Sequence, residues 1–248
     1  DVRKRIKSLT ERGGQLVVID PRRTETAELA TEHHAARPGT DAALLLALIH
    51  LLFRDGLIDM GHLSDFVDGI DDIKKAVVSY TPEWAASHTG MSSEKITQLA
   101  HDFSSADRAI CYGRMGVSTQ RFGTLCQWAI QVINVLTGNL DREGGSLFTL
   151  PAVDQVLGVS PGGFGRHASR VRQLPEFDRE LPVACLAEEI TTPGEGKIRA
   201  LFTGAGNPVL STPAGDALDD ALEDLEFMIS LDPWINETTR HADVILPP

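Results

Sequence analysis

The apolar positions along the chain alternate between short continuous runs and longer periodic segments. Continuous runs, several of them rich in β-branched residues, predict strands buried on both faces, as in a parallel sheet, at 15–19, 109–112, 198–202, 227–231 and 242–246. Between the runs, apolar residues recur at helical spacing and predict helices at 25–31, 41–54, 60–67, 71–79, 92–105, 121–137 and 213–224. Strands that alternate with helices indicate an α/β fold with mostly parallel sheets.

The amino-acid composition of the sequence changes near residue 150. Residues 139–145 form a polar turn, and 151–172 is rich in Gly, Pro and Ser, with a strong breaker at Pro161-Gly162-Gly163-Phe164-Gly165. A length of 248 residues suits one large α/β domain or two small ones. The change predicts two Rossmann-like lobes, 1–150 and 151–248.

Composition and charge narrow the classes of function. Apolar residues make up 42% and charged residues 23%, so the chain can bury a core and is not a disordered tail. The net charge of −12 argues against a generic nucleic-acid or anionic-membrane surface. The longest apolar run, 42–52, is broken by His50 and is too short to span a bilayer.

Cysteine and histidine spacing argues against a metal site built from this chain alone. Cys111, Cys126 and Cys185 include no C-x-x-C pair and are odd in number, which argues against a disulfide framework and favours the cytoplasm. The histidines lack metal-ligand spacing, and His33-His34 falls at the end of a predicted helix. Neither a G-x-S-x-G elbow nor a Walker loop is present, so we predict no catalytic residue and no metal ligand here.

Two segments of the first lobe place polar side chains where predicted strands end or helices begin. Asp20, at the end of the first strand, could accept from sugar hydroxyls, and Arg22 could donate to phosphate oxygens. The alternative is a simple turn in which Thr24 caps the next helix. Gly39 permits close approach of the backbone, and Asp41 could accept from guanine or serve the helix as a cap or first-turn acid.

Two further segments have the same character. Gly113-Arg114-Met115-Gly116 could bring backbone N–H groups to a pyrophosphate, or form a tight turn; it is not G-x-G-x-x-G. In the second lobe, Gly204-Ala205-Gly206-Asn207-Pro208 suggests a loop kept thin for a ligand. Residues 232–243 hold Trp234, Thr238 and His241, any of which could be packing residues. Spacing alone predicts a nucleotide-type binding module without a reactive group.

Taken in order, six segments resemble one family. They are 17–27 (VVIDPRRTETA), 37–41 (RPGTD), 113–120 (GRMGVSTQ), 136–139 (LTGN) with Gly144-Gly145, 206–208 (GNP) and 232–247, which ends in ADVILP. Each segment is a weak signal alone, but their order over nearly the whole chain is similar to the central part of the molybdopterin-dependent oxidoreductases, the superfamily of dimethyl-sulfoxide reductase, formate dehydrogenase and nitrate reductase.

The resemblance implies two lobes that bind a molybdenum or tungsten bis(molybdopterin guanine dinucleotide), each lobe holding one dinucleotide. It assigns the first half-site to Asp20, Arg22, Gly39, Asp41, Gly113, Met115, Gly116 and Gln120. It assigns the second to Gly206, Asn207, Pro208, Asp232 and Thr238. The cofactor would carry out two-electron redox chemistry on a small-molecule substrate, and the protein would supply orientation and electrostatics.

The resemblance also implies segments that this chain does not contain. Family members carry the metal-ligating residue, and in many cases an iron–sulfur region, upstream of the matching part, and a further domain downstream. The chain begins at Asp1 rather than Met, so we expect a piece of a longer polypeptide whose partner is an electron-transfer protein or subunit. Residues 146–155 contain no Arg where formate dehydrogenases place one, so formate is not implied as the substrate.

Two alternative families share parts of this pattern. The large peripheral subunit of respiratory complex I is similar in fold but serves as a scaffold without molybdenum. The combined presence of Asp20-Pro21-Arg22, Gly39-Thr40-Asp41 and Gly206-Asn207-Pro208 argues against it. The central domain of a thiamine-diphosphate enzyme has a similar Gly-Asn-Pro loop. It explains neither the Asp20 segment nor the C-terminal ADVILP sequence.

Overall fold

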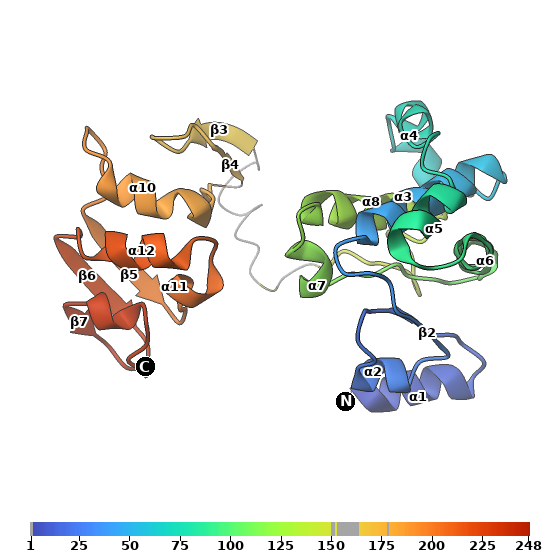
Figure 1. Ribbon diagram of the computed structural model, residues 1–248, viewed down its shortest axis with the longest axis horizontal. Helices are drawn as coiled ribbons and strands as arrows, with labels where there is room; N and C mark the ends of the chain where they lie inside the picture. Colours follow the sequence, from blue (N-terminus) through green and yellow to red (C-terminus); the bar gives the residue numbers. More distant parts are fainter. Residues whose placement is uncertain (1, 150–151, 153–163, 178) are drawn as a thin grey trace. The chain divides into compact units, whose positions relative to one another are not determined.

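The computed structural model describes residues 2–149, 152, 164–177 and 179–248. The chain divides into two compact units, Asp1–Thr149 and Leu150–Pro248 (Figure 1). Each unit has its own parallel sheet and its own hydrophobic core. The predicted α/β fold with parallel sheets is therefore confirmed.

The first unit is mostly helical. Its elements are α1 (Val2–Glu11), β1 (Val17–Ile19), α2 (Glu25–Glu28), β2 (Glu32–His34), α3 (Asp41–Arg54), the 3-10 helix η1 (Gly61–Asp65), α4 (Ile70–Ala76), α5 (Pro82–Thr89), α6 (Ser93–Ser105), α7 (Met115–Ser118) and α8 (Gly123–Leu136). The bounds of α3 are those predicted, and α6 and α8 lie within predicted segments. The segment 60–67 forms only the short η1.

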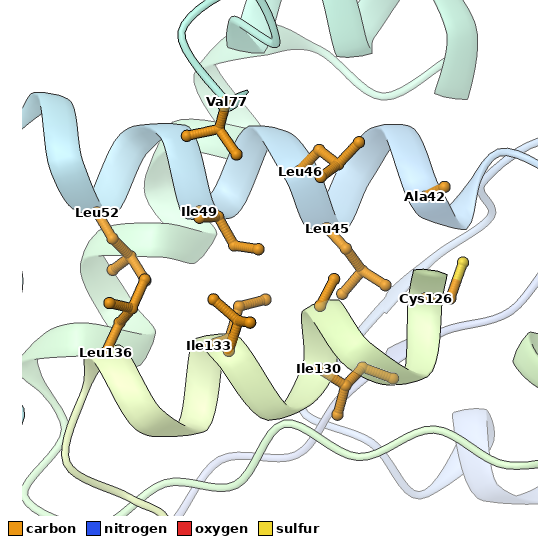
Figure 2. Close-up of a cluster of buried hydrophobic side chains, with 12 residues drawn as sticks. Ala42, Leu45, Leu46, Ile49, Leu52, Val77, Cys126, Ile130, Ile133 and Leu136 are labelled. Atoms are coloured by element: carbon orange, nitrogen blue, oxygen red, sulfur yellow. The ribbon is translucent and has the colours of Figure 1, made fainter. Parts of the chain in front are cut away.

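The core of the first unit lies around α3, which is apolar on all sides. In Figure 2, Leu45, Ile49 and Leu52 of α3 point toward Ile133 and Leu136 of α8. A second cluster joins another side of α3 to α5, α6 and β1, and includes Leu44, Ala47, Leu51, Ala85, Ile96 and Ala100. Because α3 packs against neighbours on two sides, nearly all of its residues are apolar, which is the pattern of a buried helix.

The region after β1 differs from its prediction. The predicted helix 25–31 is reduced to α2, and the chain then forms β2, which pairs in parallel with β1. His33 and His34 are therefore half-buried strand residues, not the end of a helix. The His33 ring contacts the Asp20 carbonyl at 2.9 Å. Glu32-His33-His34 carries no apolar signal, so the sequence pattern could not reveal this strand.

The predicted strand 109–112 is wrong. No strand is assigned there, because side chains rather than a neighbouring strand satisfy its backbone. The buried Asn134 amide donates to the Cys111 carbonyl and accepts from the Cys111 N–H, both at 2.9 Å. The buried Asn139 accepts from the Ala109 N–H at 3.1 Å. Two asparagines of α8 and its following turn thus take the place of a β-ladder.

The second unit contains a parallel sheet and an antiparallel hairpin. Its elements are β3 (Phe164–Ala168), β4 (Pro175–Phe177), the 3-10 helix η2 (Val183–Cys185), α10 (Leu186–Thr191), β5 (Ala200–Gly204), α11 (Pro208–Ser211), α12 (Gly215–Leu222), β6 (Phe227–Leu231), the 3-10 helix η3 (Thr239–His241) and β7 (Val244–Ile245). Strands β5, β6 and β7 lie in that order and are parallel. β6 has the predicted bounds, and α12 begins two residues after Pro213.

The core of the second unit lies between its parallel sheet and helices. Ile190 of α10, Val209 of α11 and Leu218 of α12 pack with Met228 of β6. Figure 1 shows these helices beside the sheet. Leu201 and Met228 are register partners on the helix-covered face, whereas Phe202 is 62% exposed.

The hairpin β3–β4 departs from parallel pairing and was not predicted; the first part of the segment 151–172 lies outside the described residues. The turn after β3 is anchored to α10. Arg170 donates to the Thr192 carbonyl at 2.8 Å and lies 3.3 Å from the Glu189 carboxylate. Glu189, which is buried, also accepts from the Val171 N–H at 2.8 Å. The arginine therefore caps the end of α10, where carbonyls lack helical partners.

Candidate functional site

In the second unit, the loops that follow β5 and β6 meet at the carboxyl edge of the sheet. β5 and β6 are parallel and in register to their ends, where Gly204 is opposite Leu231. The Ala205 N–H then donates to the Leu231 carbonyl at 2.9 Å. Ligands of open α/β sheets bind beyond this edge. The predicted Gly206, Asn207 and Pro208 come from the first loop, and Asp232 and Thr238 from the second.

A continuous series of hydrogen bonds joins these two loops. The Val209 N–H donates to Thr238 Oγ1 at 3.1 Å, and that hydroxyl donates to Asn207 Oδ1 at 2.7 Å. Asn207 Nδ2 donates to Glu237 Oε2 at 2.7 Å. We call these four residues the Asn207 chain. Thr238 is fully buried, and so the loops are connected by a hydroxyl that water does not reach.

Asp232 organises the second of these loops. Its carboxylate accepts from the Trp234 N–H at 2.8 Å and from the Asn236 side-chain amide at 3.5 Å. Asn236 Oδ1 in turn accepts from the N–H groups of Thr238 and Thr239 at 3.0 and 2.9 Å. Asp232 is 8% exposed and, through Asn236, helps to place Thr238. Asn236 and Glu237 were missed by the sequence analysis, although both stand in the segment that carries the family resemblance.

The loop after β5 is open on one side. A Cβ atom built at Gly204 would have no neighbour within 4 Å, and one at Gly206 would meet only the Gly204 carbonyl at 3.8 Å. Pro208 is the first residue of α11, where its missing N–H costs no hydrogen bond. The Asn207 side chain makes no cap bond to α11, because its amide is directed to the second loop. The glycine backbone therefore remains accessible to a ligand.

In the first unit, two predicted residues are in direct contact. Gln120 Nε2 donates to Asp41 Oδ2 at 2.6 Å and to the Gly116 carbonyl at 2.7 Å. Asp41 is the first residue of α3 and Thr40 is its N-cap residue, without a side-chain cap bond. The Asp41 carboxylate therefore does not cap the helix but connects α3 to the end of α7. Its first-turn position still suits a negative charge.

Asp20 and Arg22 lie at the end of β1 and belong to one tight turn. Asp20 Oδ1 accepts from the Arg22 N–H at 2.8 Å. Thr24 caps α2 by accepting from the Ala27 N–H at 3.3 Å, which is the structural alternative foreseen for this segment. The Arg22 side chain is exposed, and within the described residues no hydrogen bond or ion pair engages its guanidinium.

The remaining predicted residues of the first unit differ in what they do. Gly39 has φ +81° with no atom near a built Cβ, so it is an exposed turn glycine. Gly113 is a packing residue, because a Cβ there would lie 2.5 Å from Ile130 Cδ1. Met115 begins α7 and is 66% exposed. Arg37, although near Gly39, donates to the Ser87 carbonyl at 3.1 Å at the end of α5 and is engaged there.

The candidate residues are thus grouped differently in the two units. In the second unit, Asn207 and Thr238 are bonded to each other, Gly206 and Pro208 flank Asn207, and Asp232 supports the same loop. In the first unit, Asp41, Gln120 and Gly116 form one group, and Asp20 with Arg22 forms another. Among the described residues, no hydrogen bond connects these last two groups.

Charge and burial set the protonation states near these groups. Desolvation raises the pKa of the Cys111 thiol to about 12, so it stays protonated at neutral pH. Burial, and then the nearby Asp41 charge, raise the pKa of Cys126. The hydrogen bond from Asn207 is the largest cause that lowers the pKa of Glu237, so this residue is an ionised acceptor. Because the pKa values of Cys111 and Cys126 are both raised, neither thiol is a thiolate nucleophile at neutral pH.

Neither a metal site nor a membrane-spanning helix is present in the part of the chain that the structure describes. That part contains no group of three or more His, Cys, Asp or Glu residues placed to hold a metal ion. It also has no helix long and apolar enough to cross a bilayer. A groove of about 350 Å³ lies between 56–59 and the end of α6, and no predicted site residue lines it.

Comparisons with known proteins agree with one another. The family model described as molybdopterin oxidoreductase matches residues 2–248. The alpha subunit of an F420-dependent formate dehydrogenase from Methanocaldococcus jannaschii is 28% identical over 99% of this chain and 38% of its own length. The assimilatory nitrate reductase catalytic subunit of Bacillus subtilis is 26% identical over 96% of this chain and 36% of its own length.

A solved structure shares the fold. Acetylene hydratase from Pelobacter acetylenicus superposes with a TM-score of 0.77 and 20% identity, covering 97% of this chain and 37% of that one. The chain therefore spans less than two fifths of the length of the relatives that it matches.

Proposed function

Since the chain belongs to the molybdopterin oxidoreductase family, we propose that it binds a molybdenum or tungsten bis(molybdopterin guanine dinucleotide), with one dinucleotide on each unit. In the full-length protein it would be the cofactor-binding part of a two-electron oxidoreductase. The observation that carries the proposal is the bond between Thr238 and Asn207, which joins two loops at the carboxyl edge of a parallel sheet.

The residues of the second unit fit a nucleotide. The backbone at Gly204–Gly206 is open and presents polar groups without side-chain obstruction. Asn207 retains one Nδ2 hydrogen and a lone pair on Oδ1 beyond its two internal bonds. Asp232 keeps acceptor capacity beside the exposed Trp234. Such groups recognise hydroxyls and ring N–H groups of a guanosine end.

The residues of the first unit fit a second nucleotide in two places. Among the described residues the Asp41 carboxylate accepts from Gln120 alone, so lone pairs remain on both of its oxygens, and the pair can accept from the N1 and 2-amino hydrogens of a guanine. The exposed Arg22 guanidinium, which has no bonding partner among the described residues, offers a fork for a phosphate. These are the groups that the resemblance assigns to the first half-site, and Gly113 contributes to it only by packing the loop against α8.

The bound cofactor would supply the metal centre at which two electrons are exchanged with the substrate. The contribution of this chain is to hold the dinucleotide ends and to orient them. Relatives that match over the same region are named for formate and for nitrate, so the match over this region does not by itself specify the substrate. We propose further that the full-length protein carries an iron–sulfur cluster, as the family resemblance implies, and that it works with an electron-transfer subunit. The alpha-subunit name of one relative supports a partner subunit.

The proposal is tested on the full-length protein purified from a host that makes the cofactor. Molybdenum and tungsten are measured by mass spectrometry, and guanine nucleotide is measured after acid hydrolysis. We expect about two guanine nucleotides per metal ion, since the cofactor has two dinucleotide arms. A well-folded protein free of pterin and metal would contradict the proposal and favour a scaffold role like that of the complex I subunit.

A further inference from the structure

Glu237 is bonded to Asn207 but does not belong to the predicted site. It stands directly before Thr238 in the loop after β6, and its carboxylate accepts from Asn207 Nδ2 at 2.7 Å. Its side chain is exposed, whereas Asn207 is half-buried and Thr238 fully buried. Glu237 and Thr238, which are consecutive in the loop after β6, therefore bind the two ends of the Asn207 side-chain amide in the loop after β5.

The direction of the hydrogen bonds along the Asn207 chain is determined by its two ends. The Val209 N–H can only donate, so Thr238 Oγ1 accepts from it at 3.1 Å and must direct its own proton elsewhere. That proton goes to Asn207 Oδ1 at 2.7 Å. The opposite end of the amide, Nδ2, then faces a carboxylate, which can only accept.

A flipped Asn207 amide would lose both of its present bonds, and its new contact with Glu237 would be repulsive. Its Nδ2 would face the Thr238 hydroxyl, whose proton would lose its acceptor, and its Oδ1 would face the Glu237 carboxylate at close range. Thr238 by itself would tolerate the flipped amide, because its hydroxyl can rotate and accept from Nδ2. Glu237 offers no such alternative, because its pKa is lowered and it remains ionised at neutral pH.

We propose that Glu237 is a positioning residue that fixes the side-chain amide of Asn207 in one orientation, with a single Nδ2 hydrogen and one Oδ1 lone pair left for a ligand. This inference rests on the proposed function, since it concerns how Asn207 meets the guanosine end of the cofactor. The relevant property of Glu237 is its acceptor oxygen. Its negative charge also makes the space beside Asn207 unfavourable for a phosphate, so the adjoining ligand group is a hydroxyl or an N–H donor.

The test measures how fast the full-length holoenzyme loses its pterin during dialysis, for three variants at one position. Glu237→Gln keeps an acceptor oxygen, so we expect release within about twofold of wild type, because one hydrogen bond is retained. Glu237→Ala removes the acceptor, and we expect release about fivefold faster, the equivalent of one net hydrogen bond. Glu237→Lys places a donor against Nδ2, favours the flipped amide, and should be faster still.

Two controls separate positioning from folding. Measured on protein from which the pterin has been removed, the unfolding midpoint should stay at the wild-type value in all three variants, because the Glu237 side chain is exposed. Glu195→Ala, at an exposed acid of the same unit for which the structure shows no bonding partner among the described residues, should leave the release rate unchanged. Three outcomes would each overturn the positioning role. They are release from Glu237→Ala at the wild-type rate, release from Glu237→Gln as fast as that expected for Glu237→Ala, and a lowered unfolding midpoint.

Failure of the inference can be told apart from failure of the proposed function. A wild-type protein without pterin would remove the premise of both. If wild type holds pterin and Asn207→Ala loses it quickly, while Glu237→Ala and Glu237→Lys release it at the wild-type rate, the binding role of Asn207 stands and only the role of Glu237 is wrong.

Discussion

The two units arrange their candidate residues in different ways. In the second unit, the Asn207 chain passes without a break from α11 through two loops to Glu237. In the first unit, the bond between Gln120 and Asp41 connects two helices, and Asp20 lies in a separate turn after β1. One unit thus has a single connected group at a sheet edge, and the other has two groups.

The difference follows from what each unit uses as its framework. The second unit has a three-stranded parallel sheet, so its strands end side by side and bring their loops together. The first unit has only a two-stranded sheet, and its main core lies between α3 and α8. Its amide network of Asn134 with Cys111 supports the fold rather than a ligand. Hydrogen-bonded polar groups therefore need separate tests for stability and for binding.

The largest expected effect is in the first unit, for Asn134→Ala. This buried amide makes two bonds to the backbone of the half-buried Cys111, and its loss leaves that N–H and carbonyl unpaired, which should lower the free energy of unfolding by about 3 kcal/mol. Urea unfolding of the full-length protein measures it. Pterin content should be unchanged in the molecules that remain folded. A change below about 0.5 kcal/mol would show that water replaces the amide.

Thr238→Val in the second unit should cost less stability but release the cofactor. The substitution keeps the volume and leaves the Val209 N–H and Asn207 Oδ1 without their partner, so we expect about 2 kcal/mol. Thr238→Ser, which keeps the hydroxyl, is the matched control and should retain pterin. Equal pterin content in wild type and Thr238→Val would mean that Thr238, like Asn134 in the first unit, serves the fold and not the cofactor.

The ion pairs of the two units should differ in their pH dependence. Asp55 accepts from Arg54 and from His101 of α6, and the Arg54 bond is the main reason that its pKa is lowered from 3.8 to about 2. A depressed folded-state pKa stabilises the protein above the unfolded value, and the effect is lost as pH falls through the folded value. Asp55→Asn should therefore cost about 1.5 kcal/mol at pH 7, and the difference from wild type should shrink between pH 4 and pH 2.

Urea unfolding at a series of pH values checks this, with Glu226→Gln in the second unit as the control. Glu226 is 59% exposed in its pair with Arg199, and solvent screens such a pair, so its loss should be barely measurable. A pH-independent cost of Asp55→Asn would mean that the packing of the side chain, and not its charge, is responsible.

A smaller stability effect is expected for Asp41→Asn. The asparagine can still accept from Gln120, and only the favourable charge in the first turn of α3 is lost, so the cost should be about 0.5 kcal/mol. Pterin content should fall nonetheless, because an asparagine oxygen that accepts from Gln120 leaves the NH2 group, a donor, facing the two guanine donors. A large drop in melting temperature with normal pterin content would reverse the assignment of Asp41.

Local patterns predicted much of the fold. The helix at Asp41–Arg54 and the strand at Phe227–Leu231 have the predicted bounds, because their apolar residues recur within the element itself. The sequence carries two further signals: Thr81 and Pro82 mark the start of α5, and Asn236 and Glu237 stand between Asp232 and Thr238. By contrast, β2 is polar and exists only because β1 lies beside it.

By itself, the sequence determined which residue types stand at the ends of strands and helices, and their order was sufficient for the family. The tertiary structure decided how those residues are used. It engaged Arg37 at the end of α5, made Gly113 a packing residue, and replaced a predicted strand by backbone bonds to Asn134. It also brought Glu237 to Asn207, thirty positions away. The physical reason is that a hydrogen bond needs two partners, and when they are far apart in sequence only the folded chain sets their distance and direction.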